Sequence, residues 1–128
     1  MAYGSVLTDV VQSSVTGTPP QFNDGAGTQT GTLCRAWVNY KGTATRAINA
    51  SFNVSSVTVN GTGDFTFNFT TALADANYSA VGTNSGASAS GEYSTGIISM
   101  TSSAVRMIAF KSGVGNADST YFCVSVFR

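Results

Sequence analysis

The most constraining feature of this sequence is a seven-residue segment, residues 64–70, in which phenylalanine alternates strictly with polar residues. Successive side chains of a strand point to opposite sides, so the three phenylalanines share one face. This alternation predicts a half-buried β-strand. Asn60-Gly61 comes shortly before it and supplies the positive φ angles of a tight turn. Residues 57–60 and 64–70 are therefore expected to form an antiparallel hairpin.

Similar β-type runs fill the rest of the chain from Leu33 onward, separated by Gly, Asn and Ser. No segment longer than one turn, at residues 72–76, has a helical pattern. The sequence predicts an all-β fold, an antiparallel and jelly-roll-like β-sandwich of about eight strands. The predicted runs are 33–40, 44–54, 57–60, 64–71, 77–83, 92–101, 103–111 and 119–127.

Two local features refine this prediction. The segment 40–43 contains Gly42 and is expected to turn the Trp37 strand back onto the strand that contains Ile48. Within residues 52–59 the apolar positions change phase at Ser55-Ser56. One extra residue in a strand produces such a change, so a β-bulge is predicted there.

Residues 1–32 differ from the rest and contain both prolines of the chain. Adjacent prolines remove two backbone donors and favour an extended conformation. We predict an extended N-terminal arm, residues 1–32, followed by a sandwich domain, residues 33–128. The arm is either a floppy tail or a docking segment, whether for a larger partner or as a strand exchanged between protomers. The predicted attachment residues are Val6, Leu7, Val10, Val11, Pro19, Pro20 and Phe22.

Several predicted strands carry apolar side chains on both faces. In the last run, Tyr121, Cys123 and Phe127 alternate with three further apolar residues. A sandwich strand in a monomer usually has one polar face that is exposed to solvent. The pattern predicts a subunit interface, because homomeric interfaces are more apolar than ordinary surface. Coverage of the second face by loops or by the arm is the alternative.

The composition argues against catalysis and against several kinds of partner. The chain has no histidine, only six Lys+Arg and six Asp+Glu, and a net charge of zero. Histidine and activated nucleophiles dominate acid–base and covalent catalysis. We therefore predict no enzyme activity, no metal and no cofactor. The scattered cations also argue against nucleic-acid binding, which needs a basic cluster.

Targeting and redox features are equally sparse. The sequence contains no run of about 20 apolar residues, so no transmembrane helix is predicted. The first residues do not resemble a signal peptide. We therefore expect no membrane insertion and synthesis in the cytoplasm, followed by use outside it, as in a virion. Cys34 and Cys123 are interpreted as buried free thiols, with a disulfide as the alternative, since spacing alone does not settle their proximity.

Two small-residue loops, at 83–91 and 111–118, are expected to be exposed. Tyr93 adjoins the first loop and is the aromatic residue expected to stack on a sugar. If the protein binds a receptor, these loops are the expected contact. The predicted receptor-facing residues are Asn84, Ser85, Ser88, Ser90, Tyr93, Asn116 and Asp118.

Residues 31–40, 50–58 and 60–78 resemble small tail-fibre-type proteins of tailed bacteriophages, especially those that infect cyanobacteria and other marine bacteria. The resemblance covers roughly residues 28–82. It implies a homotrimeric fibre or knob on a tail or baseplate that contacts other virion proteins and a host glycan or protein. It transfers no catalytic residue. A capsid decoration or tail adaptor protein without a receptor role is the alternative, and an independent soluble lectin is a third hypothesis.

Overall fold

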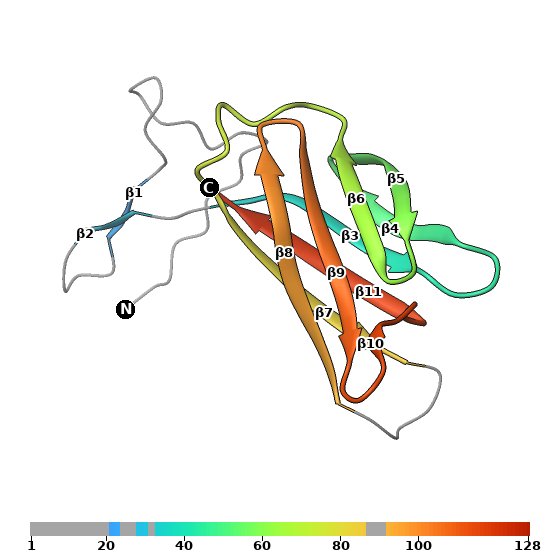
Figure 1. Cartoon of the computed structure of the whole chain (residues 1–128). Helices are drawn as coiled ribbons and strands as arrows, with labels where there is room; N and C mark the ends of the chain where they lie inside the picture. The colour runs from blue at the N-terminus through green and yellow to red at the C-terminus, as the bar shows by residue number, and fades with distance from the viewer. Residues whose placement is uncertain (1–20, 24–27, 31–32, 87–91) are drawn as a thin grey trace, which may run out of the picture. The chain divides into compact units, whose positions relative to one another are not determined.

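The computed structural model describes residues 21–23, 28–30, 33–86 and 92–128, and every regular element in these ranges is a β-strand. The chain divides into two compact units, residues 1–33 and 34–128. The first unit contains a short antiparallel pair, β1 and β2. The second is a sandwich of nine strands (Figure 1). The strands are β1 Gln21–Asn23, β2 Thr28–Thr30, β3 Cys34–Lys41, β4 Ala47–Phe52, β5 Val54–Gly61, β6 Asp64–Phe69, β7 Ser79–Ser85, β8 Tyr93–Thr101, β9 Ala104–Lys111, β10 Gly115–Asn116 and β11 Tyr121–Phe127.

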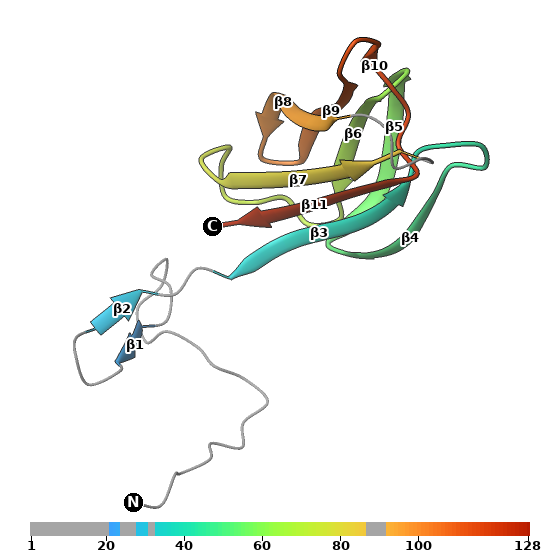
Figure 2. The same ribbon diagram turned by 90° about the horizontal axis from the view of Figure 1, so that it is seen from below.

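Two antiparallel sheets pack against each other, which confirms the predicted all-β sandwich. One sheet has the order β4-β3-β11-β7. In the other, β5 pairs with β6 and β6 with β9, while β8 and the short β10 also pair with β9. Figure 2 shows β7, β11, β3 and β4 as one layer and β5, β6, β8 and β9 as the other.

Alternation of strand direction gives the sandwich two distinct ends. Strands β3, β5, β7 and β9 run toward one end, called the loop end, and the strands that follow them run back. The loop end carries the connections after these four strands, including residues 112–120. The opposite end, called the base, carries the β4–β5 corner, the 70–78 connection, the start of β3 and the end of β11 (Figure 1).

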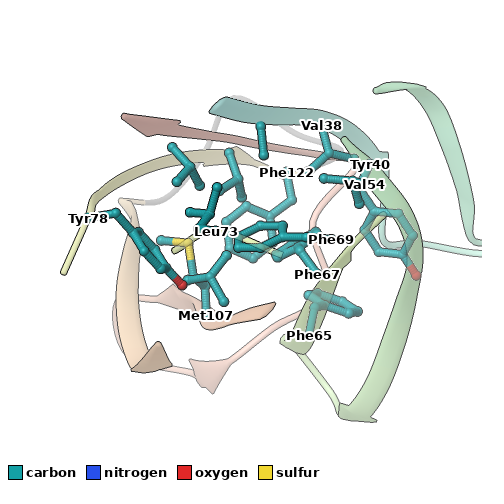
Figure 3. Close-up of a cluster of buried hydrophobic side chains, with 14 of the residues drawn as sticks. Val38, Tyr40, Val54, Phe65, Phe67, Phe69, Leu73, Tyr78, Met107 and Phe122 are labelled. Atoms are coloured by element: carbon teal, nitrogen blue, oxygen red, sulfur yellow. The ribbon is translucent and has the colours of Figure 1, made fainter. Parts of the chain in front are cut away.

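The predicted alternation in β6 builds the centre of the core. Phe65 and Phe67 are fully buried, while Thr66 and Asn68 between them are half-buried. The two rings meet Phe122 of the opposite sheet edge-to-face, with centroids 5.9 and 5.4 Å apart. Such geometry adds to the stabilisation from burial alone. Figure 3 shows these rings between the layers, with Met107 nearby.

The predicted hairpins are present, but one turn is built differently from the prediction. Strands β5 and β6 pair antiparallel, and β3 pairs with β4. The glycine with positive φ in the β5–β6 turn is Gly63, at +64°, whereas Asn60 and Gly61 lie in β5. A β-carbon at Gly63 would lie 2.6 Å from Ala117 N and 2.7 Å from Ala109 O. The backbone of the 109–117 segment therefore requires glycine at this position.

The β-bulge predicted at Ser55-Ser56 is confirmed by a register shift between Val54 and Ser56. Directly before it, Asn53 adopts a φ of +55° and turns the chain from one sheet to the other. Asparagine tolerates this conformation better than most residues. A single residue thus connects β4 and β5 at the base.

Candidate binding and assembly surfaces

The outward side of the sheet β4-β3-β11-β7, called the aromatic face, carries large apolar side chains on all four strands. The register places Phe52, Trp37, Ser125 and Val81 in one row across it. Phe52 is 55% exposed, Trp37 39% and Val81 54%. Tyr121 and Phe127 are also exposed on β11. These are several of the doubly apolar positions seen in the sequence, and they are open to solvent in the single chain.

The charge of the aromatic face has one sign. Arg35 and Lys41 lie on the same outward side of β3 as Trp37, and none of the four strands contains an acidic residue. Neither cation is among the three ion pairs that join described residues. A partner for this face should therefore bring apolar groups without adding cations.

A second, smaller apolar strip lies on β8, which is an edge strand of the other sheet. Ile97 and Ile98 are each 46% exposed, and Met100 is exposed as well. A register shift between Ile97 and Ser99 marks a bulge at this edge. A bulged edge strand pairs poorly with a strand from another chain. A partner would therefore contact this strip through side-chain packing.

The outward side of β5, β6 and β9, called the polar face, has a different chemistry. The side-chain Nδ2 of Asn68 donates to Thr58 Oγ1 at 3.0 Å and to Ser56 Oγ at 3.1 Å. The Asn60 amide donates to Thr66 Oγ1 at 2.9 Å. These contacts satisfy side-chain donors across strands. Phe110 of β9, near the loop end, is an apolar residue that is 40% exposed beside this polar surface.

An ion pair completes the polar face. The Nε–H group of Arg106 donates to Asp64 Oδ1 at 2.9 Å, and its Nη2 donates to Asp64 Oδ2 at 2.6 Å. This two-pronged geometry is the favoured one for guanidinium and carboxylate. The hydrogen bonds from Arg106 hold the pKa of Asp64 below its ordinary value, against a smaller opposing effect of burial.

The described residues predicted to face a receptor lie at the loop end, but not all of them are free to do so. Ser85 and Asn116 are exposed. Asn84 is half-buried and donates Nδ2 to the Ser94 carbonyl at 2.8 Å. Asp118 pairs with Arg46 at 2.7 Å and accepts from the Gly63 amide at 2.8 Å. Its carboxylate thus ties three loop-end segments together.

Tyr93 is half-buried rather than fully open. Its hydroxyl lies against Gly86, where any β-carbon would collide with it. The Lys111 ammonium lies 5.6 Å from the ring centroid, within the range of a cation–π contact. The most exposed large apolar residue of the described chain is Val114, 67% exposed, in the turn after β9. Val114 was not among the predicted contact residues, although its Gly-Val-Gly context is a turn signal.

The predicted attachment residues fall almost wholly outside the described ranges. Phe22 is the exception and lies in β1. The residues Val6, Leu7, Val10, Val11, Pro19 and Pro20 lie outside the described ranges, as do the predicted loop residues Ser88 and Ser90. Cys34 and Cys123 are free thiols, as predicted, but both are half-buried rather than buried.

At the base, next to Phe52, there is a hollow of about 380 Å³. It is lined by Arg35, Phe52, Asn53 and residues 70–73. Sequence reasoning missed it, because its walls come from three segments that are distant in the chain.

No protein-family model, curated protein or solved structure matches this chain. In the part of the chain that the structure describes, no helix could cross a membrane. Within the same ranges, no three His, Cys, Asp or Glu side chains gather as a metal site would require.

Proposed function

We propose that this protein is a homotrimeric virion component of a tailed bacteriophage, in a tail fibre or baseplate, that contacts the host cell surface. The observation that carries the proposal is the exposed aromatic face. The resemblance of residues 28–82 to tail-fibre-type proteins supplies the biological setting. The role is one of assembly and adhesion rather than catalysis.

The area of the aromatic face allows it to form a large part of an interface between copies. Four strands about 4.8 Å apart and about seven residues long cover roughly 440 Å² in projection, polar side chains included. This is about half of the ~800 Å² that each partner contributes to a standard interface, so the neighbouring copy must also contact residues beyond this face.

Charge favours a cyclic trimer over a face-to-face dimer. A two-fold axis through the aromatic face would bring together two copies of a surface that carries Arg35 and Lys41 and no acid. A head-to-tail contact instead joins two different surfaces and can close into a ring. The strip formed by Ile97, Ile98 and Met100 is a second apolar surface that suits this role.

The two ends of the sandwich suit the two tasks of an attachment protein. Strand β3 begins at the base, and the described residues of the two small-residue loops, 83–86 and 111–118, lie at the loop end. In this proposal the arm attaches to the virion and the loop end faces the host. Three copies with weak individual contacts would gain avidity from simultaneous binding.

Two measurements on the full chain test the proposal. Sedimentation equilibrium at micromolar concentration should give three times the chain mass, and a monomer would contradict the assembly part. The purified protein should compete with virions for adsorption to host cells. A trimer that is found in virions but does not compete would instead be a decoration or adaptor protein.

A further inference from the structure

The hollow at the base has the size of a small-molecule site. Its volume of about 380 Å³ falls within the ~300–1,000 Å³ typical of ligand pockets. It lies at the β4 corner of the aromatic face, at the end of the sandwich opposite the loops.

Asn53 makes the floor of this hollow rigid. Its side-chain Nδ2 donates to the backbone carbonyls of Arg35 at 3.0 Å and Thr71 at 3.1 Å. Its side-chain oxygen accepts from the Thr71 amide at 2.8 Å, and its carbonyl accepts from the Thr70 amide at 3.2 Å. One residue thus joins β3, the β4–β5 corner and the chain after β6. A preformed site of this kind loses little conformational entropy when a ligand binds.

The walls supply three kinds of contact. Arg35 is exposed and forms no ion pair with any described residue, whereas Arg46, Arg106 and Arg128 each have an aspartate partner. Phe52 presents an apolar ring that is 55% exposed. Thr70 and Thr71 are exposed, and their hydroxyls make no hydrogen bond within the described ranges.

We propose that this hollow binds a carboxylated sugar of the uronic-acid type. The Arg35 guanidinium matches a carboxylate in a two-pronged contact. The Phe52 ring offers a flat apolar surface to the C–H face of the sugar. The Thr70 and Thr71 hydroxyls can each donate to and accept from sugar hydroxyls.

The same walls favour a sugar over an acidic peptide. A bound peptide needs main-chain donors, but three amides along this wall are already used inside the protein. Thr70 and Thr71 donate to Asn53, and Leu73 donates to the Ser102 carbonyl at 2.7 Å. Side-chain hydroxyls are what remain, and these suit a polyhydroxylated ring. This site goes beyond the proposed attachment role. Because Arg35 and Phe52 also belong to the aromatic face, it requires that the neighbouring copy leave the β4 corner of that face uncovered.

The test is a titration of the full chain with glucuronate, followed by amide NMR shifts, with Arg35→Gln and Lys41→Gln as matched variants. Both cations lie on the outward side of β3, at opposite ends, and neither has an aspartate partner among the described residues. We expect a Kd of about 1 mM, with shifts at residues 52–53 and 70–73. Binding should weaken at least about tenfold in R35Q and less than twofold in K41Q, and glucose should not bind.

Three results would overturn the proposal: no shifts with glucuronate, equal weakening in both variants, or acetate that binds as tightly as glucuronate. The last would mark a simple carboxylate site without sugar recognition. The amide spectrum also reports whether each variant is folded. A monomeric protein that still binds glucuronate would contradict the trimer and leave this site intact.

Discussion

The two outer faces of the sandwich are built on the same strand geometry but carry opposite chemistry. On the polar face, Asn68 and Asn60 bond to neighbouring hydroxyls, and Arg106 holds Asp64. On the aromatic face, the corresponding outward positions hold Trp37, Val81 and Phe52. Contact with water is favourable for the polar side chains of the first face and unfavourable for the large apolar side chains of the second. Outward residues of a sandwich contribute little to its core, so the difference between the two faces identifies the aromatic face as the one to test for a partner.

An arginine placed on each face in turn tests whether only the aromatic face takes part in self-association. Ser125 lies between Trp37 and Val81 on the aromatic face, and Thr58 lies on β5 of the polar face. Ser125→Arg should weaken self-association by at least about 100-fold, because an unpaired charge would be buried in the interface. Thr58→Arg should leave it within about twofold. Sedimentation equilibrium measures both, and equal effects would show that the aromatic face is not the interface.

A substitution on β8 tests the surface assigned to the neighbouring copy. Ile98 is 46% exposed on the edge strand β8. In a head-to-tail trimer, Ile98→Arg should weaken association by at least about tenfold, since it loses apolar burial and adds a charge. Size-exclusion chromatography across a concentration series measures this. If Ser125→Arg dissociates the protein and Ile98→Arg does not, the contact joins the aromatic face to some other surface.

The sequence predicted the parts of this fold that depend on neighbouring residues. The alternation in residues 64–70 predicted β6 and its buried side, and the phase change at Ser55-Ser56 predicted the bulge. The apolar residues on both sides of β3 and β11 predicted a subunit interface. In the single chain their outward side is exposed, and the interface itself stays a prediction. Each of these signals lies within one or two strands.

The rest depends on contacts between distant segments, which local patterns do not encode. Asp118 bonds to Arg46, 72 positions away, so a residue predicted to face a receptor also ties loops together. Gly63 is required by the backbone of the 109–117 segment, and not by its own turn alone. The hollow at the base likewise combines Arg35, Phe52 and residues 70–73. None of these pairings has a signal in sequence spacing.

The charged part of the polar face can be tested by pH. The pKa of Asp64 is lowered in the folded protein below its ordinary value, chiefly by hydrogen bonds from Arg106. The unfolded state therefore takes up the proton first as pH falls. The contribution of Asp64 to stability is complete above about pH 4 and is lost as pH falls through the lowered pKa. In urea unfolding between pH 2 and 6, Asp64→Asn should therefore lose less stability on acidification than the wild type. An unchanged pH slope would show that the pair contributes nothing.

A last substitution tests whether the uncharged hydrogen bonds of the polar face stabilise the fold or only keep this face hydrated. Asn68→Ala removes the hydrogen bonds to Thr58 and Ser56, both on the surface. Water replaces such bonds, so the free energy of unfolding should fall by only about 0.5–1 kcal/mol. The adjacent Phe67→Ala, on the buried side of the same strand, should cost about 3–5 kcal/mol. Urea unfolding of both variants gives the ratio. A loss of several kcal/mol in Asn68→Ala would mean that the polar face is a structural network, and the contrast between the two faces would no longer be one of solvation alone.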